Sequence, residues 1–140
     1  ASTGITGAAG ESQVFPWLLL DLSRRRYGEM DYPWLATVLT RDDLLQFKGY
    51  FHGGVIGGLA DLAAGGAVAT MLPPGRGVVT ISLHVNFLAP ARGERLVARG
   101  SVVKVGSTVG VASVDVVAVE SGHERLCSTA TVTFRVVSAG

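Results

Sequence analysis

The sequence predicts an α+β domain in which one long buried helix is wrapped by a curved antiparallel sheet of five to six strands. Residues 55–72 are apolar or glycine on every side except at Asp61 and Thr70, and a helix that is apolar all round is a buried helix. Four later segments have the composition and turn boundaries of strands. They are residues 79–87, 94–105, 108–119 and 124–137.

Length and composition fit one globular domain over residues 1–140. The chain has a hydrophobic fraction of 48% and a mean hydropathy of +0.40, which exclude a disordered chain and favour a well-buried sheet or an oligomer. A formal net charge of +1 gives no overall attraction to nucleic acid or to an anionic membrane. We therefore expect neither as a partner, and a charged ligand would have to meet a local patch.

The N-terminal part is expected to be simple. Residues 1–11 are small and polar and predict a flexible start, and residues 12–27 predict a short packing helix with Ser12 as its N-cap. The first residues lack the basic segment of a signal peptide. Cys127 is the single cysteine, which fits a reducing compartment. We therefore expect a cytoplasmic protein.

The remaining elements follow in order from local signals. Residues 32–40 predict a first strand, and residues 41–49 a polar connection to the helix. Prolines and glycines at 73–77 end the helix. In residues 79–87 the odd positions are apolar and the even ones polar, so a half-buried strand is predicted that puts Thr80 on the polar face. Turn residues at 106–107 and 121–122 predict antiparallel hairpins.

The helix is long enough to raise a second interpretation, a membrane span. Asp61 in its middle would be costly in lipid, and glycine and alanine favour partitioning only weakly. Aromatic residues do not flank both ends. The sequence therefore favours a helix buried in protein, with a carboxylate that needs either a partner or a purpose.

Several motifs resemble those of the hotdog-fold acyl-CoA thioesterases, in particular the phenylacetate-degradation type and its hydroxybenzoyl-CoA thioesterase relatives. His52-Gly53-Gly54 opens the helix, and an acid, Asp61, follows nine positions after the histidine. Asn86-Phe87-Leu88-Ala89-Pro90 closes the next strand. The resemblance covers residues 34–136. A threonine that some members carry one turn after the acid is Gly65 here.

The resemblance implies a hotdog fold, homodimers with a continuous sheet and often homotetramers. It implies hydrolysis of a thioester to a free acid and coenzyme A, with coenzyme A as part of the substrate and no other cofactor. Asp61 would be the catalytic carboxylate, as general base or nucleophile. Gln46, six positions before the histidine, would orient substrate or water, and Thr80 would supply a hydroxyl that hydrogen-bonds to Asp61.

Helix geometry adds a requirement. Free N–H groups at a helix start are oxyanion donors, and Gly53 and Gly54 leave them accessible. Gly53 and Asp61 are eight residues apart, roughly 12 Å along the axis, yet both must approach one reacting group. We therefore expect a composite site in a two-fold dimer, with Gly53 and Gln46 from one subunit and Asp61 and Thr80 from the other.

Other candidates have weaker support. His52 is expected to shape the turn into the helix and, with Gly54, to lie against the substrate. Three cations beside turns are candidates for the coenzyme phosphates. They are Arg76, Arg92 and Lys104. The histidines show no metal-ligand spacing, so no metal is expected. A serine triad is disfavoured because Ser82 and His84 share one strand without a nucleophile elbow.

Two alternatives to hydrolysis stay open. A hotdog module that binds acyl thioesters without turnover would have the same fold and pocket. A hotdog hydratase acting on enoyl-CoA would want a histidine near the acid, and none lies near Asp61.

Overall fold

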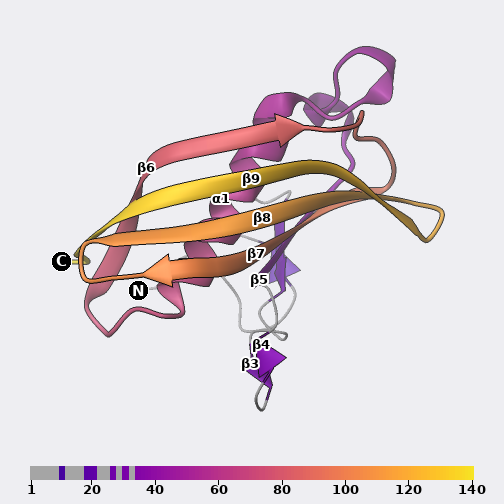
Figure 1. Cartoon of the computed structure of the whole chain (residues 1–140). Coiled ribbons are helices and arrows are strands. Elements are labelled where there is room, and N and C mark those ends of the chain that lie inside the picture. The colour runs from indigo at the N-terminus through magenta and orange to yellow at the C-terminus, as the bar shows by residue number, and fades with distance from the viewer. Residues whose placement is uncertain (1–9, 12–17, 22–25, 28–29, 32–33) are drawn as a thin grey trace.

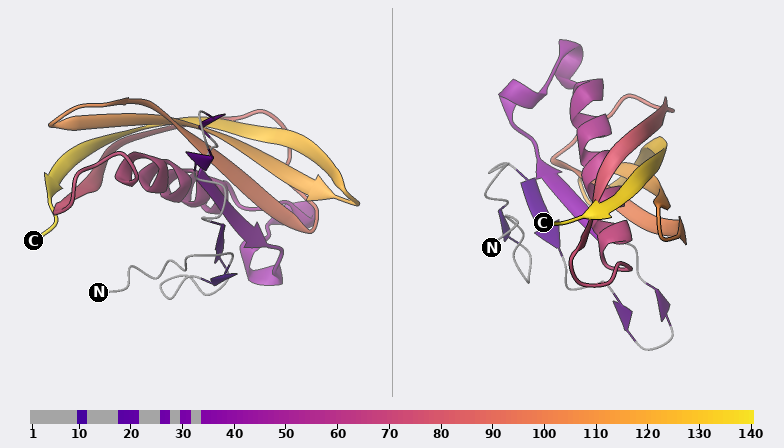
Figure 2. Two further views of the ribbon diagram at one scale, coloured as in Figure 1. Left: turned by 90° about the horizontal axis from the view of Figure 1, so that it is seen from below. Right: turned by 90° about the vertical axis from the view of Figure 1, so that its left-hand side faces the viewer.

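The computed structural model describes residues 10–11, 18–21, 26–27, 30–31 and 34–140. One helix, α1 (Gly53–Ala69), lies along the concave face of a curved antiparallel sheet (Figures 1 and 2). The sheet has seven strands in the order β1-β2-β5-β7-β8-β9-β6. The predicted helix wrapped by a curved antiparallel sheet is therefore present.

Five long strands contact α1. They are β5 (Trp34–Leu39), β6 (Arg76–Phe87), β7 (Arg95–Val105), β8 (Val109–Glu120) and β9 (His123–Ser138). Their bounds lie within three residues of the predicted ones. The two predicted hairpins join β7 to β8 and β8 to β9. Strand β6 pairs with β9 and forms one edge of the sheet, a position that turn signals alone do not specify.

The prediction for residues 12–27 was wrong where the structure describes them. Strand β2 (Leu18–Asp21) pairs with β5, and β3 (Arg26–Tyr27) pairs with β4 (Met30–Asp31). The sheet edge at β5 offers unpaired backbone groups, and pairing there outweighs the helical pattern of a short segment. Residues 1–9 of the predicted flexible start lie outside the described residues, and β1 (Gly10–Glu11) pairs with β2.

The core lies between α1 and the sheet. Alanines and larger aliphatic residues of the helix, from Ile56 to Val68, are buried against residues such as Leu96 and Phe134. Gly100 of β7 lets the two backbones approach, because a Cβ there would lie 2.5 Å from the carbonyl oxygen of Ala63. The opposite side of α1 is open in the single chain, where Gly54 and Gly58 are exposed. The helix is thus buried on one side rather than all round.

Strand β6 departs from strict alternation. A bulge at Ile81 separates the register pairs Thr80–Phe134 and Ser82–Thr133. Leu83 and Phe87 face the helix after the bulge, since their side chains are those closest to Cβ positions built on Gly57 and Gly53. Thr80, before the bulge, faces the helix as well. The extra residue shifts the parity of the strand, so the prediction that Thr80 lies on the face opposite to Leu83 was wrong.

A second bulge changes β9. Val116 pairs with Ser128 and Val117 with Leu126, which leaves Cys127 as the extra residue. Cys127 is fully buried whereas Leu126 is 43% exposed. The alternation in the sequence predicts the reverse for these two residues, with Leu126 on the apolar face. The bulge exchanges their faces.

Candidate active site

The start of α1 is held by two neighbouring segments. The N–H of His52 donates to the carbonyl of Leu44 at 3.0 Å, and the N–H of Phe51 donates to Ala91 at 2.8 Å. His52 is the N-cap, with extended backbone and no side-chain cap hydrogen bond, and its side chain is exposed. His52 therefore occupies the N-cap position through its backbone, and its side chain makes no capping hydrogen bond.

The first N–H groups of α1 are accessible donors. The N–H of Val55 donates to the carbonyl of His52 at 3.0 Å. Among the described residues, the N–H groups of Gly53 and Gly54 have no hydrogen-bond partner. A Cβ on Gly54 would meet no atom within 4 Å. These two donors carry the partial positive charge of the helix start, so an oxyanion could be stabilised there.

A cavity of about 450 Å³ opens at this helix start. Gln46 and Gly53 both line it, so the structure brings these two predicted site residues together. Nε2 of Gln46 donates to the carbonyl of Phe51 at 3.1 Å, which fixes the amide plane and leaves its carbonyl oxygen for a ligand. Most of the other lining residues are apolar, including Ile56, Phe87 and Leu88. Such a cavity suits an apolar group that ends in a polar one.

Asp61 and Thr80 form a second group farther along the helix. The hydroxyl of Thr80 donates to Oδ1 of Asp61 at 2.8 Å, which confirms the hydrogen bond expected between them. Asp61 is partly buried, and no ion pair between described residues includes it. The second carboxylate oxygen, Oδ2, has no hydrogen-bond partner among the residues that the structure describes. The carboxylate is therefore oriented by a neutral donor and keeps an oxygen for chemistry.

These two groups do not meet within one chain. Asp61 is not among the residues that line the cavity with Gln46 and Gly53. The eight-residue spacing on a regular helix separates Gly53 from Asp61 by roughly 12 Å. One chain thus presents two halves of a potential site on the same open side of α1.

The three predicted phosphate-binding cations lie in two places. Arg92 follows β6, and its Nε lies 3.8 Å from Oε2 of Glu120. Arg76 donates to the carbonyl of Ser107 at 3.3 Å, in the turn between β7 and β8 beside which Lys104 pairs with Val111. Within one chain the structure does not bring Arg76 or Lys104 together with Arg92.

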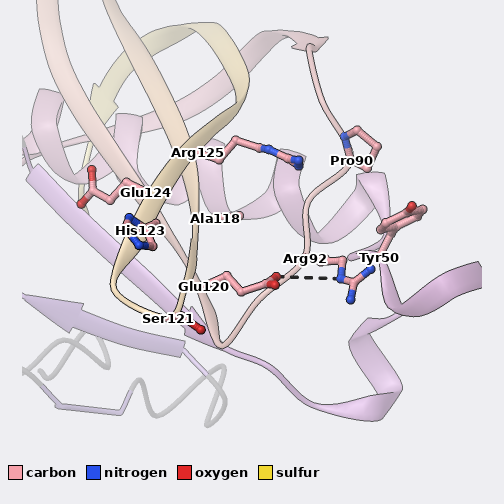
Figure 3. Close-up of a pocket in the computed structure, with 9 residues that line it drawn as sticks. All are labelled: Tyr50, Pro90, Arg92, Ala118, Glu120, Ser121, His123, Glu124 and Arg125. Carbon is pink, nitrogen blue, oxygen red and sulfur yellow. Dashed lines mark ion pairs between the residues drawn. The ribbon is translucent and has the colours of Figure 1, made fainter.

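The structure also has a polar cavity that the motifs do not indicate. Its volume is about 600 Å³, and it lies between the loop after β6 and the β8–β9 hairpin (Figure 3). Arg125 and Tyr50 line it together with Arg92. Arg125 follows the predicted hairpin turn, a position that the sequence provides, but nothing in the sequence places it opposite Arg92.

Two titratable groups have shifted pKa values. A hydrogen bond from Arg99 to Glu124, at 2.6 Å, lowers the pKa of this carboxyl group. Burial raises the pKa of the Cys127 thiol, whose Sγ donates to the carbonyl of Val116 at 3.3 Å. A buried thiol with a raised pKa is a poor nucleophile, so Cys127 is a packing residue.

Metal and membrane sites find no support in the described part of the chain. Residues 34–140 and the short strands before them hold no group of three or more side chains suited to bind a metal ion. None of the described helices combines the length and the apolar character needed to cross a bilayer.

Comparison with known proteins gives a consistent result. A family model described as "Thioesterase superfamily" matches residues 48–124, more than half of the chain. A Halobacterium salinarum protein, whose name assigns it provisionally as an esterase, is 51% identical over 72 residues, which is 50% of this chain and 47% of that protein. The match therefore spans about half the length of this curated relative.

Solved structures show the same fold. A thioesterase family protein from Silicibacter pomeroyi has 29% identity and a TM-score of 0.78, and the match covers 88% of this chain and 86% of that one. A Bacillus halodurans protein solved with CoA has 26% identity and a TM-score of 0.67, covering 74% of this chain and 66% of that one. Both matches therefore cover most of this chain.

Proposed function

Because this chain belongs to the thioesterase superfamily, we propose that it hydrolyses the thioester of an acyl- or aryl-acyl-CoA to the free acid and coenzyme A. Within the superfamily we propose the branch of phenylacetate-degradation and hydroxybenzoyl-CoA thioesterases, on the spacing of the HGG turn and Asp61. The observation that carries the proposal is the Thr80–Asp61 hydrogen bond of 2.8 Å on the open side of a helix whose first N–H groups are free.

The proposed reaction needs both halves of the site. In one route Asp61 takes a proton from water, and the water oxygen attacks the thioester carbonyl while the Gly53 N–H binds the oxyanion. The carbon–sulfur bond then breaks, and the thiolate of coenzyme A takes up the proton. In the other route a carboxylate oxygen of Asp61 attacks the thioester carbonyl and expels the coenzyme A thiolate, and water then hydrolyses the resulting anhydride to the free acid and the Asp61 carboxylate. Gln46 orients water or substrate in either route.

A two-fold dimer would bring the halves together. Strand β6 is an edge strand with exposed apolar side chains, and such an edge favours pairing with a second chain. The exposed apolar side chains of β6 are Val79, Ile81, Leu83 and Phe87. An isologous dimer would create two equal sites, each with Gly53 and Gln46 of one subunit facing Asp61 and Thr80 of its mate. Two such dimers would form the homotetramer that the resemblance implies.

The first experiment measures thiol release from a panel of acyl-CoAs. We expect Asp61→Asn to lower kcat about 1000-fold, within the range found for general bases, with an unchanged thermal midpoint. Binding of acyl-CoA without release of thiol by the wild type would instead support the non-catalytic module. A kcat in Asp61→Asn close to the wild-type value would exclude the proposed role of Asp61.

A second experiment tests the composite site. Gly53→Pro removes the donor at the first helical position, where proline is tolerated, and the extended backbone of His52 accepts a following proline. When subunits of this variant and of Asp61→Asn reassociate at random, half of all dimers are heterodimers. Each heterodimer has one intact site and one site with both changes. We expect about a quarter of wild-type activity from this mixture. Sites built within one chain would give no recovery.

A further inference from the structure

The polar cavity adjoins the apolar one. Tyr50 and Pro90 line both, so the two volumes meet at the loop that precedes the helix and the loop that follows β6. The smaller cavity has the helix donors and apolar walls, whereas the larger one has guanidinium, phenol and imidazole groups. A single elongated ligand could therefore lie in both, with its apolar, reactive end at Gly53 and a polar end beyond Tyr50.

The charges in the polar cavity are not equally engaged. Glu124 already accepts from Arg99 at 2.6 Å, and its side chain extends away from Arg125 (Figure 3). Arg125 instead points across the cavity toward Pro90 (Figure 3), and no ion pair between described residues includes it. The Arg125 guanidinium is therefore available to a ligand.

Arg92 is held only weakly. Its Nε lies 3.8 Å from Glu120, and the two side chains are 60% and 56% exposed. Exposed ion pairs contribute about 0 to 1 kcal/mol, so an incoming anion can replace Glu120 at little cost. Arg92 and Arg125 then present two planar, multidentate donors from two sides of one cavity, the geometry that suits phosphate groups.

We propose that this cavity binds the phosphorylated nucleotide end of coenzyme A, with Arg125 and Arg92 on its phosphates and Tyr50 at the passage to the thioester. The inference rests on the proposed function, since it assigns the far end of the same substrate. A volume of about 600 Å³ is in the range of small-molecule sites. Arg125 and Arg92 would thereby select coenzyme A thioesters over thioesters that lack the nucleotide.

The test compares kcat/KM for an acyl-CoA with that for the matching acyl-pantetheine. We expect Arg125→Gln to lower the ratio of these two values about tenfold, mainly through KM for the acyl-CoA, because the lost contact is equal in ground and transition states. Arg92→Gln should lower the ratio less. Glu120→Gln should raise it, because this change removes a competing carboxylate. Arg135→Gln, an exposed arginine elsewhere on β9, should leave the ratio at the wild-type value.

An independent readout is binding of adenosine 3′,5′-bisphosphate, measured by calorimetry on the whole chain. We expect the wild type to bind it and Arg125→Gln to bind it about tenfold more weakly. Hydrolysis of both thioesters with an unchanged ratio in Arg125→Gln would overturn the nucleotide site and leave the proposed function intact. Absence of hydrolysis would overturn the proposed function. In that case, nucleotide binding that is absent or insensitive to Arg125→Gln overturns the site, and binding weakened by this variant supports it.

Discussion

The two sides of α1 use glycine for opposite purposes. On the side that faces β7 and β8, a Cβ on Gly100 would lie 2.5 Å from Ala63 O, and one on Gly110 would lie 2.7 Å from a methyl group of Val68. On the open side, a Cβ on Gly54 or Gly58 would meet nothing within 4 Å. The first pair allows helix and sheet to pack closely. The second pair leaves space that none of the described residues fills.

This contrast separates stability from function. A glycine inside a helix or a strand costs about 0.5 to 1 kcal/mol relative to alanine, and at Gly100 and Gly110 of the strands close contact with the helix offsets that cost. On the open side none of the described residues compensates the cost at Gly54 and Gly58, and Asp61 lies on that side with one carboxylate oxygen that no described residue hydrogen-bonds. The open side is therefore where a substrate or a second subunit would supply the missing contacts.

The largest expected effect is on the packed side. Gly100→Ala should lower the free energy of unfolding by about 3 kcal/mol, because its Cβ would meet helix backbone that cannot rotate away. Urea unfolding followed by circular dichroism measures this. Gly58→Ala is the matched control and should change stability by less than about 1 kcal/mol. Similar decreases in the free energy of unfolding in Gly100→Ala and Gly58→Ala would contradict the contrast between the two sides.

The next prediction concerns the edge beside the open side. Ile81→Lys should weaken self-association at least about 30-fold, equivalent to about 2 kcal/mol, because a charge would be buried where β6 pairs with its mate. Analytical ultracentrifugation over a concentration series measures the change. Val103→Lys alters another exposed apolar residue at a bulge, on β7 away from this edge, and should still form dimers. Equal self-association of Ile81→Lys and Val103→Lys would argue against pairing through β6.

A smaller effect is expected from Thr80→Val. The substitution keeps the shape of the side chain and removes the donor to Asp61, so kcat should fall about tenfold with little change in KM. Thr131→Val, on an exposed position of β9, provides the control. A change in KM alone, with kcat preserved, would show that Thr80 contacts substrate rather than positioning the carboxylate.

The smallest effect concerns Glu124, away from both sides of the helix. Because the hydrogen bond from Arg99 lowers the pKa of Glu124 in the folded state below the ordinary value of a glutamate, the charged carboxylate stabilises the fold above that ordinary pKa. This contribution is lost as the pH falls through the lowered pKa. Glu124→Gln should thus cost less than about 1 kcal/mol at pH 7, and the difference should vanish in acid. Thermal unfolding of the wild type and Glu124→Gln over a pH series would measure this difference in stability. A difference that grows in acid would contradict the stabilising role of the charged carboxylate.

Much of the fold follows from local patterns. The all-apolar helix, the Pro-Gly stop after it and the two hairpin turns specify one helix and three consecutive strands, because these signals depend on neighbouring residues. The place of β6 beside β9 depends on long-range pairing, which leaves no mark in the turn residues. The short strand Leu18–Asp21 was missed for the same reason, since pairing with β5 overrides local preference.

The candidate site was predictable only in part. Spacing along one helix was enough to predict that Gly53 and Asp61 lie apart within one chain, whereas their meeting across a dimer stays a prediction. Resemblance supplied Thr80, although the alternation of β6 placed it on the wrong face, because a bulge cannot be read from a regular pattern of apolar residues. Arg125 and Tyr50 were missed because they come from distant parts of the chain and no motif links them.

The extra residue in β6 has a consequence for the comparison of relatives. Deleting Ile81 would restore strict pairing with β9 and leave Thr80 on the helix face, because Thr80 and Leu83 would then be two positions apart instead of three. A homologue with that deletion would retain the HGG turn, the acid and the hydroxyl that faces it, with one residue fewer between the hydroxyl and the end of the strand. Alignments of this family therefore need to record gaps within this strand, because the residue that faces the acid is set by its register with β9 and not by a fixed distance from the motif that closes the strand.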